Sequence, residues 1–160
     1  MRLVISDLLG ESFEKLNILR DGDYFIFADG RYSPCIGCFK CWLKTPGICI
    51  LKDKLQRVGV LFGYADEIYI VTKNTYGSYS PQVKNIIDRS LSNSTPFFTY
   101  KNFEVHHIDR YKKKEDFLVK VFVYGDMNDL EEATFKDLLQ RNAINMGCKN
   151  PVFEKIEVEK

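Results

Sequence analysis

Four of the chain's five cysteines lie in one short segment, where Cys35, Cys38, Cys41 and Cys49 have the spacing C-x2-C-x2-C-x7-C. Three thiols at intervals of three cannot all face inward in an ordinary core, but on a tight loop they can converge on one small inorganic group. The Thr45–Gly47 segment has turn chemistry, because proline presets its own φ and glycine accepts a positive φ, so the chain can double back with Cys49. Four sulfur ligands suit an iron–sulfur cluster or Zn, and spacing alone does not separate the two.

Cysteines can also form disulfides or serve as inert core residues. A disulfide framework is disfavoured, because five is an odd number, 160 residues exceed the length of a stapled miniprotein, and the N-terminus does not resemble a secretion signal. Inert thiols stay open as an alternative, since free cysteine packs like a small hydrophobe. Cys148 lies apart, just past an expected helix end, and is interpreted as structural.

Length and composition predict a single domain over residues 1–160. A chain of this length buries roughly two thirds of its unfolded surface without help from a metal, so a metal would serve function more than stability. Charged residues make up 28% of the chain and leave a net charge of +1, which indicates neither disorder nor nucleic-acid binding. No apolar run approaches the roughly 20 residues of a membrane span, so we expect a cytoplasmic protein with small molecules or proteins as partners and no membrane partner.

Apolar runs of the kind that form buried strands occur at Arg2–Ser6, Asp23–Ala28, Glu67–Thr72, Phe117–Tyr124 and Val152–Val158. Helical patterns lie between them, which predicts an α/β protein with a doubly wound, five-stranded parallel sheet in the order 2-1-3-4-5. The first connection, residues 7–22, is barely long enough for a parallel crossover. Its helix is therefore expected to be short, with Phe13, Leu16 and Leu19 facing inward.

Three later helices have clearer signals. The first is expected over Lys54–Ala65. The second begins at Ser80, a natural N-cap followed by proline, and the third begins at Asn128, which has capping-box spacing to Glu131 and ends near Gly147. Their buried faces are expected to consist of Leu55, Val58, Leu61, Phe62 and Ala65 in the first, Val83, Ile86, Ile87 and Leu91 in the second, and Phe135, Leu138, Leu139 and Met146 in the third.

Residues 97–116 have no clear helical period and are predicted to form a loop or hairpin excursion. Within it, His106, His107 and Arg110 are weak candidates for catalysis, because adjacent residues on a strand point to opposite faces and no nucleophile is nearby. The run Lys112–Lys114 is interpreted as a solvated charge run, with recruitment of a nucleotide phosphate or an acidic redox partner as the lesser alternative.

In an open doubly wound sheet, ligands bind beyond the carboxyl ends of the strands. Four loops are expected at that edge: Ser6–Ser12, the cysteine segment, Lys73–Ser80 and Gly125–Asn128. The third offers amide, hydroxyl and backbone donors and an aromatic face just before a helix N-terminus, so it could hold a flat heterocycle. A plain polar turn is the alternative interpretation of this loop.

Two blocks carry a resemblance to a known family. PCIGCFKCWLKTPGICILKD at Pro34–Asp53 and TKNTYGSYSPQVKNIIDR at Thr72–Arg89 resemble, in order and spacing, the flavodoxin-fold NAD(P)H-dependent FMN reductases, which include the iron–sulfur flavoproteins. The resemblance implies a flavodoxin-like fold, FMN at the strand tips, NAD(P)H as electron donor and a homodimer or higher oligomer. In the iron–sulfur branch it also implies a 4Fe–4S cluster on the four cysteines. Trp42 and the Thr45–Gly47 turn leave the branch open.

On this resemblance, Ser6 and Ser12 would serve the FMN phosphate, and the isoalloxazine ring would be flanked by Gly125 and by Thr72, Lys73, Asn74, Thr75, Tyr76, Gly77 and Ser78. No catalytic residue is nominated, because hydride transfer at a flavin needs no specific side-chain acid or base.

The chain also departs from the family. Its first loop is only SDLLGES, a weakened form of the family's phosphate loop, and Asp7 and Glu11 place negative charge where a phosphate dianion should bind. Lys73 and Thr75 replace the usual Pro-x-Tyr turn, although Tyr76 could supply a stacking face and Lys73 a positive charge.

The sequence therefore predicts an FMN-dependent oxidoreductase that takes electrons from NAD(P)H or a redox protein, with or without an iron–sulfur cluster. The alternative is a flavin-free flavodoxin-like binding or scaffold protein, or an electron carrier that uses only the cysteine segment.

Overall fold

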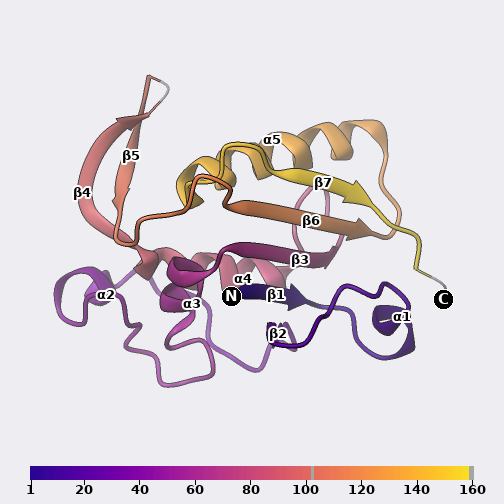
Figure 1. Cartoon of the computed structure of the whole chain (residues 1–160), viewed down its shortest axis with the longest axis horizontal. Helices are drawn as coiled ribbons and strands as arrows, with labels where there is room; N and C mark the ends of the chain where they lie inside the picture. The colour runs from indigo at the N-terminus through magenta and orange to yellow at the C-terminus, as the bar shows by residue number, and fades with distance from the viewer. Residues whose placement is uncertain (102, 159–160) are drawn as a thin grey trace.

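The structure, a computed structural model, describes residues 1–101 and 103–158. A five-stranded sheet in the order β2-β1-β3-β6-β7 forms its centre, and every neighbouring pair in the sheet is parallel (Figure 1). The strands are β1 (Arg2–Ser6), β2 (Tyr24–Phe27), β3 (Glu67–Lys73), β6 (Leu118–Tyr124) and β7 (Val152–Lys155). This is the predicted flavodoxin-like topology, although β7 ends three residues earlier than the predicted Val158.

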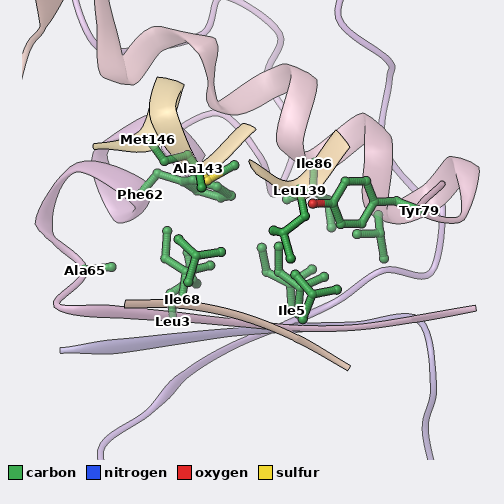
Figure 2. Close-up of a cluster of buried hydrophobic side chains, with 14 of the residues drawn as sticks. Leu3, Ile5, Phe62, Ala65, Ile68, Tyr79, Ile86, Leu139, Ala143 and Met146 are labelled. Carbon is green, nitrogen blue, oxygen red and sulfur yellow. The ribbon is translucent and has the colours of Figure 1, made fainter. Parts of the chain in front are cut away.

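Both faces of the central strands are buried, which explains why these strands are continuously apolar rather than alternating. The larger core lies between one face of the sheet and helices α3, α4 and α5, and Figure 2 shows Leu3, Ile5 and Ile68 rising from the strands toward Phe62, Ile86 and Leu139. The opposite face holds a smaller cluster around Val4, Phe13, Val71 and Phe122.

The helices are α1 (Glu11–Glu14), α2 (Lys40–Leu43), α3 (Val58–Tyr64), α4 (Pro81–Arg89) and α5 (Asp129–Met146), and the 3-10 helix η1 (Ser90–Asn93) follows α4. Both predicted N-caps are confirmed. Ser80 accepts a hydrogen bond from the Val83 amide, and Asn128 and Glu131 form a reciprocal capping box. Gly147 ends α5 in the left-handed conformation, as predicted.

Three predictions about these helices are wrong. The helix expected from Lys54 begins only at Val58 and follows a series of turns. Leu91 does not continue the buried face of α4, because the chain tightens into η1 and leaves this side chain 36% exposed. Leu19 is 40% exposed, because α1 ends at Glu14 and the helical spacing does not extend that far.

The predicted excursion is an antiparallel hairpin of β4 (Ser94–Lys101) and β5 (Glu104–Asp109). The two histidines point to different neighbours, as expected for adjacent strand residues. The His106 Nδ1 atom lies 2.9 Å from the Asn145 Oδ1 atom of α5. The His107 ring instead packs at a tilt against Trp42 and Phe98, with ring centroids 4.6 and 4.8 Å apart. The hairpin therefore packs against the cysteine segment.

Lys113 corrects the interpretation of Lys112–Lys114 as a wholly solvated run. Its ammonium group donates to three carbonyl oxygens at the end of α3: Phe62 O, Gly63 O at 3.1 Å and Ala65 O at 3.4 Å. Burial lowers the pKa of Lys113 to about 8. Lys112 and Lys114 are exposed.

The cysteine segment does not lie where the sequence placed it. The strands point toward α1, whereas α2 and the hairpin lie at the opposite, amino end of the sheet (Figure 1). After β2 the chain runs back along α4, and the Tyr32 hydroxyl donates to Gln82 O near the start of this helix. Among the described residues no helix is long and apolar enough to cross a membrane.

Candidate functional site

The cysteine segment is an irregular loop held in place by local hydrogen bonds. Gly37 and Phe39 have positive φ, and α2 supplies only one turn around Cys41. The predicted turn at Thr45–Gly47 is present: the Ile48 amide donates to Thr45 O at 2.8 Å, and Gly47 has φ 85°. A side chain at Gly47 would also meet the Tyr111 hydroxyl at 3.1 Å, so glycine suits this position for two reasons.

The turn brings the four thiols to one small pocket, which Cys35, Cys38, Cys41 and Cys49 all line. All five cysteines are free thiols. Burial, together with the charges of the other three cysteines, raises the pKa of Cys41. Such a group of thiols resists joint ionisation unless positive charge enters the pocket, and a bound metal centre provides that charge.

Arg89 lines the same pocket and is the most deeply buried charged side chain near it, with a side chain that is 0% exposed. It makes a two-pronged ion pair with Asp53, with both nitrogen–oxygen distances at 2.9 Å, and also donates to Ser33 O and Leu51 O. Because Ser33 and Leu51 flank the cysteines on both sides, Arg89 fixes the two ends of the segment.

Within the part of the chain that the structure describes, the buried Nε–H group of Arg89 has no hydrogen-bond acceptor. Burial opposes the charge of Arg89, but the hydrogen bond to Asp53 and the charge and proximity of the Cys49 side chain outweigh it and raise the pKa of Arg89. A cationic donor beside four thiols suits an anionic sulfur-rich group.

The donor set of this pocket therefore fits a thiolate-bound metal centre in its chemistry. A single tetrahedral Zn would need sulfurs about 3.8 Å apart, given Zn–S bonds of about 2.3 Å. Among residues 1–101 and 103–158, no group of three or more His, Cys, Asp or Glu side chains is arranged to hold a single metal ion.

A larger cavity of about 450 Å³ adjoins the cysteine pocket and shares four lining residues with it: Cys35, Gly37, Asp88 and Leu91. Residues of α4, α5 and the hairpin complete its walls, among them Asn142, Asn145 and His107. Because Cys35 is exposed, this cavity leaves the thiols accessible to a reaction partner from one side.

The strand tips, at the other end of the sheet, are organised by Asp7. Its carboxylate accepts hydrogen bonds from the Lys73 amide at 3.0 Å, the Thr72 hydroxyl at 3.3 Å and the Tyr124 hydroxyl at 3.1 Å. One side chain from the end of β1 thus binds the ends of β3 and β6. Burial and the charge of Asp7 raise the pKa of Tyr124, so its hydroxyl remains a donor.

The residues predicted to bind the FMN phosphate do not form a phosphate loop. The Ser6 hydroxyl is buried and hydrogen-bonded to both the amide and the carbonyl of Leu8. Ser12 lies in α1, a helix of only four residues. Glu11 is directed outward and pairs with Lys15 at 3.4 Å, so of the two acidic residues only Asp7 reaches the strand tips.

The loop predicted to flank a flavin ring folds toward α5. Asn74 donates to Asp126 O at 2.7 Å and accepts from the Gly77 amide, and Thr75 and Ser78 close a turn. Tyr76 is 89% exposed. The remaining residues lie at the same edge: Thr72 is buried, Lys73 is exposed, and Gly125 lies beside the Lys73 side chain.

The strand tips thus fit FMN only in part. Thr72, Lys73 and Gly125 lie at one edge, as expected around a ring. However, the Asp7 carboxylate already accepts from Lys73, Thr72 and Tyr124, and the Ser6 hydroxyl is bonded to Leu8.

Two residues of these sites were not found from the sequence. Arg89 follows Val83 and Ile86 on the buried face of α4. A charged residue at an apolar position of a helix signals a buried ion pair, so this role could have been predicted. Tyr124 ends a strand, and nothing in the sequence signals that it would contact Asp7 117 positions away.

Comparison with known proteins agrees with the resemblance seen in the sequence. No protein-family model matches the chain. An iron–sulfur flavoprotein of Methanocaldococcus jannaschii is 32% identical over 68 residues, which is 42% of this chain and 34% of the relative. The match thus spans about a third of the length of that curated relative.

Solved structures with the same fold cover nearly the whole chain. An FMN-dependent NADH-azoreductase from Bacillus anthracis, in complex with FMN, has a TM-score of 0.61 at 12% identity over 98% of this chain and 86% of its own. An NAD(P)H:quinone oxidoreductase from Methanothermobacter marburgensis has a TM-score of 0.59 at 12% identity over 98% and 85%. The Trp repressor binding protein from Bacillus subtilis has a TM-score of 0.57 at 14% identity over 100% and 88%. At these identities the likeness establishes a shared flavodoxin-like fold.

Proposed function

We propose that this chain is an electron-transfer oxidoreductase whose redox centre is an iron–sulfur cluster held by Cys35, Cys38, Cys41 and Cys49. One observation carries the proposal: four free thiols line a single pocket together with the buried Arg89, whose Nε–H has no acceptor among the described residues. The partial match to an iron–sulfur flavoprotein supports iron and sulfide over Zn as the contents of that pocket.

Each part of the site has a role in this function. A bound cluster would supply reversible one-electron transfer. The four thiolates would hold it, and the Arg89 guanidinium would offset their negative charge and donate to sulfur. Asp53 keeps the guanidinium in place. The adjoining cavity and the exposed Cys35 give a redox protein or small acceptor access to this end of the molecule.

Metal and sulfide analysis of anaerobic protein tests the proposal. After reconstitution with ferrous iron and sulfide, we expect roughly four irons and four sulfides per chain, with broad brown absorbance that dithionite bleaches. Cys41→Ser should lose most of the bound iron. Cys148→Ser is the matched control. Cys148 is buried in the main core and does not line the cysteine pocket, so this substitution should leave the iron content unchanged. Zn without sulfide, or equal iron in both variants, would contradict the cluster.

A second candidate is an NAD(P)H-dependent FMN reductase that works at the strand tips. The FMN-bound azoreductase and the NAD(P)H:quinone oxidoreductase, whose folds match nearly the whole chain, favour it, as do the polar groups of Lys73–Ser78. On this proposal the donor is a reduced nicotinamide and the protein is a cytoplasmic homodimer. Bound flavin in purified protein and flavin-dependent oxidation of NADH or NADPH would support it. A colourless protein that ignores added FMN would refute it.

A further inference from the structure

The strand tips contain an anion that belongs to the protein itself. Asp7 lies directly after β1, at the point in the strand order where neighbouring connections leave in opposite directions, β1 to β2 and β3 to β6. In doubly wound sheets this point is where ligands bind. Three donors converge on the Asp7 carboxylate there: one backbone amide and two hydroxyls.

These donors are the kind that a phosphate group uses, namely a backbone N–H at a strand end and neighbouring hydroxyls. Two of these donor residues are also held by other hydrogen bonds, so they cannot easily turn to a new acceptor. The buried Thr72 hydroxyl accepts from the Ser80 amide at 2.9 Å, and the Tyr124 carbonyl accepts from the Asn74 amide at 2.8 Å. A phosphate at this point would have to displace Asp7 or lie against its charge.

Other charges at this edge do not offset Asp7. The Lys73 ammonium is on an exposed side chain that runs beside Gly125, and within the described residues no ion pair joins it to Asp7. Glu11 faces outward toward Lys15.

From this geometry we infer that Asp7 is a built-in substitute for a ligand phosphate and excludes phosphate-bearing flavins from the strand tips. An uncharged flavin carries no phosphate for the Asp7 carboxylate to repel and is therefore disfavoured less. This inference concerns the end of the sheet that the proposed cluster does not use, so it stands or falls separately from iron binding. It opposes the second candidate function, in which FMN binds at the strand tips.

Flavin titration of the whole chain tests the inference, with FMN and riboflavin as probes and quenching of flavin fluorescence as the readout. Wild-type protein should bind FMN more weakly than riboflavin. Asp7→Asn should raise FMN affinity at least about tenfold, equivalent to about 1.4 kcal/mol, and change riboflavin affinity less than about twofold. Asp7→Ser serves as a second variant in case the amide of Asn disturbs the donors, and thermal unfolding checks that each variant is folded.

Two controls separate charge from packing. Glu11→Gln removes a nearby negative charge that does not face the tips and should leave FMN affinity unchanged. Tyr124→Phe removes one donor but keeps the Asp7 charge, and it should not restore FMN binding. Wild-type protein that binds FMN at least as tightly as riboflavin would overturn the inference. So would folded Asp7→Asn and Asp7→Ser variants whose FMN affinity does not rise, including the case in which no flavin binds to any of them.

Discussion

The buried guanidinium of Arg89 is the residue on which the cysteine pocket most depends. Its side chain is 0% exposed and Asp53 is 19% exposed, so the pair lies mostly outside solvent. Removal of one partner from such a pair leaves an uncompensated charge. Arg89→Met should therefore lower the free energy of unfolding by about 3–5 kcal/mol, as measured by urea denaturation.

Lys84→Met is the control for this prediction. Lys84 forms an exposed ion pair with Asp88 one turn away on the same helix, at 2.7 Å, and its loss should cost at most about 0.5 kcal/mol. Arg89→Met combined with Asp53→Asn should be less destabilised than the sum of the single variants, because the buried carboxylate is then neutral. Equal effects of Arg89→Met and Lys84→Met would show that the buried pair contributes no more than a surface one.

Individual elements could be predicted where local chemistry determines them. Apolar runs identified all five strands of the sheet, and the side chains of Ser80 and Asn128 identified two helix starts. The path of the chain after β2 could not be predicted in this way. It depends on contacts such as the Tyr32 hydroxyl with Gln82 and Trp42 with Leu91, which join residues about 50 positions apart. For that reason the sequence predicted that the four thiols would converge, as they do on one pocket, but placed them at the wrong end of the sheet.

The end of α3 provides an element-scale prediction. Lys113 donates to the free carbonyls there, and burial lowers its pKa to about 8 from an ordinary 10.5. Between pH 8 and 10.5 the unfolded chain keeps this proton while the folded chain releases it, so unfolding takes up a proton and stability rises with pH. Below pH 8 Lys113 is protonated in both the folded and the unfolded chain, so the full cost of burying its charge lowers the stability of the folded chain.

Lys113→Met removes this titration and leaves the other groups in place. The free energy of unfolding of wild-type protein minus that of Lys113→Met should therefore increase from pH 7.5 to pH 10, as followed by urea denaturation at each pH. Lys112→Met, which alters an exposed lysine, should show no such trend. A constant difference for Lys113→Met would mean that Lys113 titrates alike in the folded and unfolded chain.

At the scale of the whole molecule, the segment around α2 and the loop between β1 and α1 lie at opposite ends of one sheet (Figure 1). The first carries the four cysteines and the second carries Asp7. The seven residues of β3 separate the ends by roughly 20 Å. Among the described residues, Asp7 and its donors Thr72, Lys73 and Tyr124 share no hydrogen-bond partner with the cysteine pocket. Changes at sites so far apart usually combine additively, within about 0.5 kcal/mol. We therefore expect the two ends to behave independently within one chain.

A double-variant cycle of Asp7→Asn and Cys41→Ser measures this independence. Asp7→Asn should retain the iron content of reconstituted wild-type protein, and Cys41→Ser should leave the FMN affinity of the Asp7→Asn background within about twofold, the size of change that 0.5 kcal/mol produces. Because substitutions more than about 10 Å apart with no shared partners usually act additively, a change at one end should leave the other end unchanged. A coupling free energy above about 1 kcal/mol, measured at equal protein concentration, would show instead that the two ends communicate, for example through contact between copies of the chain.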